Sequence, residues 1–426
     1  MKICIENAIV FDGERSFENA CVHIAGAFIV YAGPSEKAPA FDAQKRIDAR
    51  GGIAMPGLCN AHTHMAMSLL RGLGSDLNLQ DWLENAIFPA EDKLTHETAT
   101  AGVMLSIMEQ LRFGVTSFAD MYYFMDGAAE AVKETGIRAL LTRGLVGDVS
   151  ADSTRLDENI DLIRRYHGAC DGRIRCGLGT HAEYTNNEAS LIRQAEVARE
   201  LGCSVHVHVS ETAKEVAECK ERHGGLSPVK YLYNLGLLTP NTLAAHCVHV
   251  DEEDIALLAR SGASVAHNPI SNLKLASGVM PLGRMLDAGI NVALGTDGCA
   301  SNNTLNLWEE IRLTAILHKG VSGDPTLITP RQVLSMATIG GARAMGFEDV
   351  GYLRPGYRAD IILVDATGAH MQPCKDPAVN LTYSAQGSDV FMTMVDGKVL
   401  YEDGAFLTLD AQEVTRKAQE AVETVW

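Results

Sequence analysis

The chain has 426 residues, of which 46 % are apolar and 21 % are charged, so it can bury one large core or two to three ordinary ones. Its 36 basic and 54 acidic side chains give a formal net charge of −18. Nucleic acids and anionic membranes favour a positive protein surface, so this charge argues against both as partners.

The ten cysteines are scattered, without a Cys-x-x-Cys pair or the even spacing of a disulfide framework. The first residues, MKICIENAIVFDGE, lack the long apolar segment of a signal peptide, and no run of 18 apolar residues occurs in the sequence. These observations predict a soluble, cytoplasmic protein with reduced thiols.

Both ends of the chain are rich in short strand patterns. Residues 1–54 contain CIENAIVF and ACVHIAGAFIVYAG, which Asp-Gly and Gly-Pro turns separate. Residues 347–426 contain ADIILVD and DVFMTMVDGKVLYEDG, with a hairpin turn at Asp396-Gly397. We expect the two ends to meet in one small β-sandwich domain, and we expect an amphipathic helix over residues 410–426.

Residues 55–346 alternate between strand and helix patterns. Eight apolar, β-branched segments, the first IAMPGLCNAHTH and the last INVALGTDG, are separated by helix-like segments such as 187–201 and 251–261. An alternation of this length predicts a (β/α)₈ TIM-like barrel, with an open doubly wound sheet as the alternative. The predicted fold class is therefore α/β, with the barrel as the catalytic domain.

Polar side chains stand at the carboxyl ends of these predicted strands. Because all strand ends of a barrel meet on one rim, residues that are far apart in the sequence converge there. The set comprises His62, His64, Asp120, Arg143, His181, His208, His246, His267 and Asp297. The rim is therefore the candidate active site.

Three imidazoles and one carboxylate on this rim match the ligands of a divalent transition metal, with zinc favoured and iron, nickel or manganese as alternatives. In NAHTHM, strand alternation places His62 and His64 on the same face. A single buried histidine is often only a hydrogen-bonded core residue, but the pattern recurs at the first, fifth, sixth and eighth strands. The fourth strand ends in GTHAEYT, without a lysine that could bridge a second ion, which favours one metal ion.

Glu211 lies just beyond His208 in HVHVSET, near enough to the rim to move a proton without binding the metal. Its alternative role is that of an acidic helix-start residue beside Thr212. A divalent ion lowers the pKa of its bound water from about 15.7 to about 7. With Asp297 and His246 orienting that water, the rim predicts hydrolysis at an electrophilic carbon that carries a leaving group.

The chain also contains a series of longer motifs that span nearly its whole length. They are PGLCNAHTHMAMSLLRG, WLENAIFPAEDKLT, HVHVSET, AAHCVHV, VAHNPISNLKLASG, VALGTDGCASNN and GYLRPGYRADIILVD. Together these motifs resemble the amidohydrolase superfamily, and within it the 5-methylthioadenosine/S-adenosylhomocysteine deaminase group.

The resemblance implies a site with one divalent metal ion, with zinc favoured. The implied ligands are His62, His64, His208 and Asp297. The implied catalytic residues are Glu211, His246 and Asp297, of which Glu211 and Asp297 also contact the substrate. His206 lies on the same strand face as His208 and competes with it on geometry, but the family pattern His-x-x-Glu selects His208.

The resemblance further implies substrate contacts for four residues. Glu91 would bind the ribose hydroxyls, Arg143 and Arg155 the tail of the substrate, and His181 the purine ring. A carboxylate can accept hydrogen bonds from a diol, and a guanidinium can pair with an amino-acid carboxylate. The alternative for Glu91 and Arg155 is that each is a solvated surface charge. Two departures bear on the shape of the pocket: Glu183 stands where proline is usual, and the loop between Arg155 and His181 is slightly longer.

The function that the resemblance implies is hydrolytic deamination of adenosine derivatives to the inosine derivative and ammonia. The candidates are S-adenosylhomocysteine, 5′-methylthioadenosine, adenosine and 5′-deoxyadenosine, and the resemblance also implies a homo-oligomer. One alternative is a related deaminase or chlorohydrolase that acts on a free base or a triazine. The other is a non-catalytic amidohydrolase-like scaffold, although such scaffolds usually lack metal ligands and none is missing here.

Overall fold

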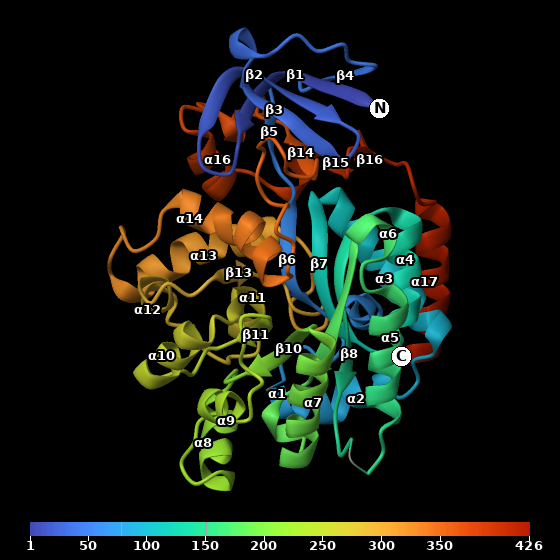
Figure 1. Ribbon diagram of the computed structural model, residues 1–426, viewed down its shortest axis with the longest axis vertical. Coiled ribbons are helices and arrows are strands. Elements are labelled where there is room, and N and C mark those ends of the chain that lie inside the picture. The colour runs from blue at the N-terminus through green and yellow to red at the C-terminus, as the bar shows by residue number, and fades with distance from the viewer. Residues whose placement is uncertain (78, 150) are drawn as a thin grey trace.

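The computed structural model describes residues 1–77, 79–149 and 151–426 (Figure 1). Two sheets organise these residues: an eight-stranded parallel sheet that curves into a barrel, and a nine-stranded mixed sheet at the top of the view. Within the described ranges, no helix combines the length and the apolar character that crossing a membrane requires.

The barrel strands follow one another in chain order. They are β6 (Leu58–Thr63), β7 (Val115–Tyr122), β8 (Arg138–Leu145), β9 (Ile174–Thr180), β10 (Ser204–Val209), β11 (Thr242–His246), β12 (Ser264–His267) and β13 (Val292–Leu294). Each strand pairs in parallel with its neighbours in the chain. Beyond β13, the backbone N–H of Asp297 donates to the carbonyl of His62 at 3.0 Å and joins the last strand to the first. The predicted barrel is confirmed, and the open doubly wound sheet does not apply.

Helices cover the outside of the barrel (Figure 1). Their bounds are α1 (Leu79–Trp82), α2 (Phe88–Glu91), α3 (His96–Arg112), α4 (Met125–Thr135), α5 (Thr154–Tyr166), α6 (Ala169–Gly172), α7 (Glu188–Leu201), α8 (Ala213–Arg222), α9 (Pro228–Asn234), α10 (Glu252–Ser261), α11 (Pro269–Lys274), α12 (Leu282–Asp287), α13 (Leu307–Ser322), α14 (Pro330–Ser335), α15 (Gly341–Ala344), α16 (Pro377–Tyr383) and α17 (Ala411–Val425). The side chain of Asn187 caps α7 and that of Asp251 caps α10, which explains why these two helices begin where the sequence predicts.

Small apolar side chains fill the inside of the barrel. Ala61, Ala119, Ala245, Ala266 and Ala293 are all completely buried there. A dry, close-packed floor of this kind keeps water away from the polar side chains at the strand ends above it. The histidines of the rim therefore lie in a low-dielectric environment, where burial disfavours their charged form.

The mixed sheet contains strands from both ends of the chain. Its strands are β1 (Lys2–Phe11), β2 (Ser16–Ala25), β3 (Phe28–Pro34), β4 (Lys45–Asp48), β5 (Ile53–Pro56), β14 (Ile361–Val364), β15 (Val390–Val395), β16 (Lys398–Glu402) and β17 (Ala405–Phe406). The amino-terminal β5 pairs antiparallel with the carboxy-terminal β14, and apolar residues from both ends form one core. The predicted meeting of the two ends is confirmed.

The expected hairpin lies between β15 and β16, where Val395 pairs with Lys398. Asp396 and Gly397 form its turn with φ angles of 49° and 73°, which suits an Asp-Gly turn of type I′. We retain the division into a terminal domain, residues 1–54 and 347–426, and a barrel, residues 55–346, as a proposal. The helix α17 lies in the terminal part of that division but packs against α3 of the barrel.

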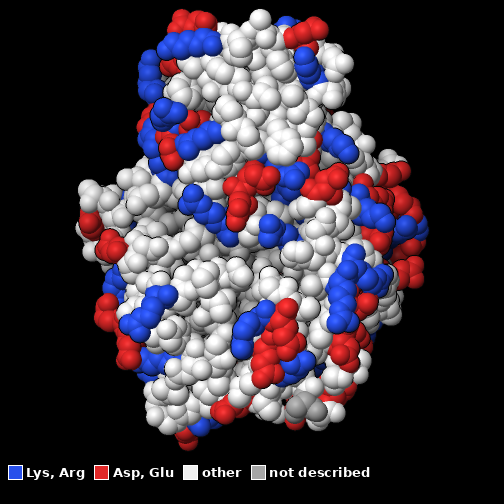
Figure 2. Space-filling model, viewed as in Figure 1, with Lys and Arg blue, Asp and Glu red and all other residues white. Residues whose placement is uncertain are grey.

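Charged side chains of both signs are interspersed over the face of the molecule that Figure 2 shows. Among the described residues on this face, no continuous band of lysine and arginine is visible. A nucleic-acid-binding face requires such a band, so the face offers no support for that kind of partner.

A buried ion network joins the mixed sheet to the barrel. Arg138 at the start of β8 is 1 % exposed, and its guanidinium donates to Asp360 at 2.8 Å and to Asp396 at 2.7 Å. Arg358 also donates to Asp396, at 3.0 Å. Because this network holds the sheet at the amino ends of the strands, the carboxyl ends stay clear on the opposite side.

We expect Arg138→Ala to destabilise the protein by about 3–5 kcal/mol, because it leaves the buried carboxylate of Asp360 without its cation. The measurement is the midpoint of urea unfolding. The control is Arg46→Ala, which removes an exposed ion pair with Glu6 in the same sheet and should leave the midpoint in place. An equal effect of the two variants would show that the network does not hold the two units together.

Candidate metal centre and substrate cavity

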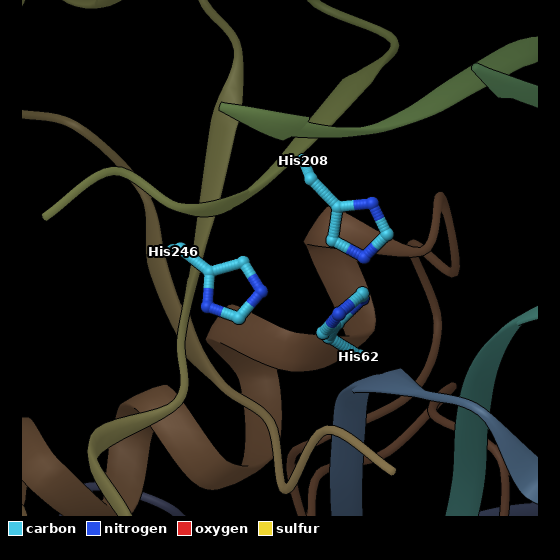
Figure 3. Close-up of side chains that lie close together, drawn as sticks. All are labelled: His62, His208 and His246. Carbon is cyan, nitrogen blue, oxygen red and sulfur yellow. The ribbon is translucent and has the colours of Figure 1, made fainter. Parts of the chain in front are cut away.

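Five side chains of types that can bind a metal ion meet at the carboxyl ends of the barrel strands. His62, His208 and His246 each offer a ring nitrogen within 4.8 Å of the others, and His62, His64 and Asp297 form a second such group. Figure 3 shows the rings of His62, His208 and His246 turned toward one another. Because the two groups share His62, they form one centre.

Backbone carbonyls fix the orientation of two of these rings. The Nδ1 of His64 donates to the carbonyl of Met121 at 2.6 Å, and the Nδ1 of His208 donates to the carbonyl of His181 at 2.7 Å. A carbonyl can only accept a hydrogen bond, so each Nδ1 must carry a hydrogen. The Nε2 atoms, 3.3 Å apart, are the ones that face the centre, as in metal-binding histidines whose other nitrogen is hydrogen-bonded.

Asp297 presents one carboxylate oxygen to the centre. Its Oδ1 lies 3.4 Å from the Nε2 of His62 and 3.1 Å from that of His64, while its Oδ2 accepts from Ser271 at 2.6 Å and from Ser301 at 2.7 Å. Burial raises the pKa of Asp297, but the attraction of the facing His62 and His64 rings outweighs burial and holds the pKa well below its usual value. The carboxylate is therefore ionised.

The donor set fits a divalent metal ion. The Nε2 of His62 is buried and makes no hydrogen bond to any residue that the structure describes, an arrangement that costs about 1–3 kcal/mol for a polar atom with no other partner. Burial lowers the pKa of His62 to about 3 and that of His208 well below its usual value, so both rings are neutral, as metal ligands must be. At His64, Asp297 outweighs burial and raises the pKa to about 9, so a metal ion that binds there must displace a proton. Imidazole nitrogens and a carboxylate oxygen are the ligands that zinc prefers.

His206, the competing candidate on β10, lies behind His62. Its Nε2 is 2.8 Å from the Nδ1 of His62, and burial holds the pKa of His206 well below its usual value. If the Nε2 of His62 is to bind a metal, its Nδ1 must donate this hydrogen bond to a neutral His206. The geometry therefore makes His206 an orienting partner of His62.

Glu211 faces the centre from the segment that follows β10. Its Oε2 lies 3.9 Å from the Nε2 of His246, and its Oε1 accepts from Ser277 at 3.2 Å. Burial raises the pKa of Glu211. The helix-start role that was its alternative is filled by Thr212, which caps α8, and by Glu215, whose carboxylate accepts the N–H groups of Ser210 and Glu211.

His246 and Asp297 are both held in a strained backbone conformation. Their φ angles are 73° and 62°, in the left-handed region that costs a residue other than glycine about 1–3 kcal/mol. The Nδ1 of His246 is further held by Asn272, at 2.8 Å. Such strain is maintained only where the surrounding structure enforces it, which makes the two strand ends candidate functional positions.

A cavity of about 890 Å³ opens over the centre, near the upper end of the range of about 300–1,000 Å³ for small-molecule sites. All four predicted substrate residues line it, namely Glu91, Arg143, Arg155 and His181. The cavity is also lined by His64, His208, His246, Glu211 and Asp297. The structure thus brings the predicted substrate residues and the predicted catalytic residues to one space.

Two of the substrate candidates have clear electrostatic environments. Glu91, at the end of α2, accepts from the hydroxyl of Tyr122 at 2.6 Å, and burial raises its pKa to about 7 against that bond. The ring of His181 lies 4.9 Å from that of His208, and burial lowers the pKa of His181 to about 4. A neutral imidazole and a carboxyl that titrates near neutrality therefore face the cavity.

Several supporting residues escaped the sequence reasoning. Ser271, Asn272 and Ser277 hold Asp297, His246 and Glu211 respectively. All three lie in the segment VAHNPISNLKLASG, whose polar residues between apolar ones were the available signal. Tyr122 and Ser301 carried no pattern that would have identified them.

A metal centre at the carboxyl end of a (β/α)₈ barrel with a β-rich terminal domain defines a class of metal-dependent hydrolases. The chain belongs to the amidohydrolase family, whose model matches residues 53–400. It is 48 % identical over 386 residues to 5-methylthioadenosine/S-adenosylhomocysteine deaminase from Moorella thermoacetica, a match that covers 90 % of each chain. It is 46 % identical over 426 residues to 5′-deoxyadenosine deaminase from Methanosarcina barkeri, covering 99 % of this chain and 98 % of the other.

Among solved structures, the chain is similar to an adenosine deaminase from Xanthomonas campestris with bound zinc. The TM-score is 0.95 at 34 % sequence identity, and the match covers 99 % of this chain and 98 % of the other. The likeness therefore extends over both the barrel and the terminal sheet.

We expect His206→Ala to weaken zinc binding by roughly 10- to 100-fold, because His62 loses the partner that orients it. Zinc affinity is measured by competition with a chelating dye. His206→Gln should restore part of the affinity, since its amide oxygen can accept from the Nδ1 of His62.

The control is His318→Gln, which alters another buried histidine, bonded to His267 at 2.9 Å and outside the metal-binding groups. It should leave the zinc affinity unchanged. Unaltered zinc binding by His206→Ala would contradict the role of His206 as an orienting partner.

Proposed function

We propose that this protein is a metal-dependent hydrolase that deaminates adenosine derivatives to the inosine derivative and ammonia. The proposed substrates are S-adenosylhomocysteine and 5′-methylthioadenosine, with adenosine and 5′-deoxyadenosine as further candidates. The observation that carries the proposal is one cavity that contains the His/Asp centre, Glu211 and the buried carboxyl of Glu91. The deaminase names of relatives that match nearly the whole chain support it.

The proposed cofactor is one zinc ion per chain, held by His62, His64, His208 and Asp297. The orphan Nε2 of His62 and the bound zinc of the Xanthomonas campestris deaminase support this assignment. When bound, such an ion supplies hydroxide at neutral pH.

Three side chains of the chain itself handle protons in this proposal. Glu211, whose pKa burial raises, faces the centre and carries a proton to a purine ring nitrogen. Asp297 and His246 face the same space and orient the attacking water. The carbon attacked is C6 of the purine. One proton of the attacking water goes to the ring nitrogen and the other to the amino group, which then leaves as ammonia.

The remaining cavity residues select the substrate. We propose that Glu91, held by Tyr122, accepts hydrogen bonds from the ribose hydroxyls, and that neutral His181 contacts the purine. Arg143 and Arg155 line the outer part of the same cavity, where guanidinium groups suit a carboxylate on the substrate tail.

The proposed setting is a cytoplasmic homo-oligomer whose partner is a small nucleoside, without nucleic acid or membrane. All ten cysteines are free thiols, eight of them buried, which supports a reducing compartment. The net charge of −18 disfavours polyanionic partners.

The direct experiment is ammonia release from the four nucleosides, with guanine and a triazine as comparison substrates. We expect activity with nucleosides, its loss after treatment with a chelator, and its return with one equivalent of Zn²⁺ per chain. Activity with guanine or the triazine alone would favour the chlorohydrolase or free-base alternative. A purified chain that binds no metal and releases no ammonia would favour the non-catalytic scaffold.

Glu91 makes substrate binding depend on pH. Its pKa of about 7, raised by burial, means that the carboxyl is mostly protonated at pH 6 and mostly ionised at pH 8. Because an ionised carboxylate is the stronger acceptor for the ribose hydroxyls, we expect the KM for 5′-methylthioadenosine to fall by up to roughly tenfold across this interval.

The control for this titration is Glu91→Gln, whose amide stays neutral throughout. It should raise the KM and remove its pH dependence between pH 6 and 8. A KM that varies with pH to the same extent in both proteins would assign the titration to another group.

A further inference from the structure

The outer wall of the cavity carries alternating charges from one face of α5. Arg155, Glu158, Asp161 and Arg165 all line the cavity, because residues three and four apart share a face of a helix. Arg143, at the end of β8, lines the same wall. The wall is therefore built from three guanidinium groups and two carboxylates.

Four of these five groups are paired with one another. Arg165 contacts Asp161 at 3.1 Å, and the Nε of Arg143 donates to the Oε2 of Glu158 at 2.8 Å. Arg155 has no carboxylate partner among the described residues, and its Nη1 donates to the backbone carbonyl of Val146 at 3.0 Å. The wall thus keeps one guanidinium that is not bonded to a carboxylate of the described residues, that of Arg155.

Glu158 keeps an oxygen for a further partner. Its Oε2 is bonded to Arg143, its Oε1 makes no hydrogen bond within the described part of the chain, and its side chain is 53 % exposed at the edge of the cavity. Arg143 is itself held, because its guanidinium lies 5.2 Å from the ring of Tyr123. Arg143 therefore positions the carboxylate of Glu158.

An unpaired guanidinium and a half-free carboxylate one turn apart fit a specific kind of ligand. Residues three apart on a helix have Cβ atoms about 5–6 Å apart. Arg155 and Glu158 therefore suit a ligand whose own positive and negative charges lie close together. An α-amino acid carries an ammonium and a carboxylate on one carbon. A neutral 5′ group, such as a methyl or a methylthio group, offers neither charge.

We infer that Glu158 is a specificity-determining residue, which accepts the ammonium of an α-amino acid at the 5′ end of the nucleoside. Arg155 binds the carboxylate of the same amino acid. This inference rests on the proposed deaminase function. It identifies the preferred substrate class as nucleosides with an amino-acid 5′ tail, S-adenosylhomocysteine among those named above.

The test compares three substrates within each protein: S-adenosylhomocysteine, its analogue without the amino group, and 5′-deoxyadenosine. In Glu158→Gln, we expect the ratio of kcat/KM for S-adenosylhomocysteine to that for 5′-deoxyadenosine to fall about tenfold or more, because a charge-assisted bond is lost. The change should lie in KM. The corresponding ratio for the analogue without the amino group should change by no more than about twofold, since that analogue makes no such bond.

The matched control is Asp161→Asn, which removes the same charge from the same face of α5, one turn further along. It should change the S-adenosylhomocysteine ratio by no more than about twofold, because Asp161 does not bind the ammonium in this inference. A general change of the cavity potential would instead lower the ratio in both variants. Ratios within one protein are insensitive to the fraction that is folded, so partial misfolding does not imitate the expected result.

The outcomes separate this inference from the function on which it rests. If the nucleosides react but Glu158→Gln lowers the ratios for S-adenosylhomocysteine and for its analogue equally, or lowers neither, the role of Glu158 is wrong and the deaminase function stands. An equal fall of the S-adenosylhomocysteine ratio in Asp161→Asn leads to the same conclusion. If no nucleoside releases ammonia, both fail.

Discussion

The hydrogen bond from the N–H of Asp297 to the carbonyl of His62 closes the barrel, and the metal centre depends on that closure. It brings the last strand beside the first, so that the carboxylate of Asp297 comes within reach of His62 and His64. In an open sheet of the same strand order, these residues would lie at opposite edges. The sheet curvature is therefore what turns three separate motifs into one binding site.

Desolvation is the second condition on which the site depends. An apolar floor of alanines removes water from below, so the polar groups above must satisfy one another or remain without partners. Ser271 and Ser301 hold the far oxygen of Asp297, and His206 holds the far nitrogen of His62. These outer hydrogen bonds determine which atoms of His62 and Asp297 are free to face the centre. Side chains that bind metals are commonly oriented in this way.

Much of the fold was predictable because it depends on local periodicity. The eight strands, the helices that Asn187 and Asp251 cap, and the Asp396-Gly397 hairpin all follow from patterns within about ten residues. The candidate ligands were identifiable because barrel topology sends every strand end to one rim. The sequence was sufficient for these features, because each depends either on neighbouring residues in the chain or on a general rule of the barrel fold.

The contacts that connect distant segments could not be predicted in this way. Nothing local to Arg138 indicates that it meets Asp360 and Asp396. Likewise, nothing in SVHVHV shows that His206 lies behind His62 and that His208 faces the centre. Glu183 illustrates the same limit. It was noticed as a departure from proline, but only the structure shows its carboxylate buried against Arg222 at 2.8 Å and His223 at 2.7 Å, where it ties the segment after β9 to the end of α8.

The pairing of β5 with β14 has a consequence for how the chain is made. Ile53 pairs with Val364 across the whole length of the barrel segment, so this contact has a very high sequence separation and forms slowly. During synthesis the amino-terminal strands leave the ribosome long before β14 exists. Until then the edge of β5 that will pair with β14 is an unpaired template for other strands, so the terminal sheet stays open to pairing with other chains until the end of synthesis.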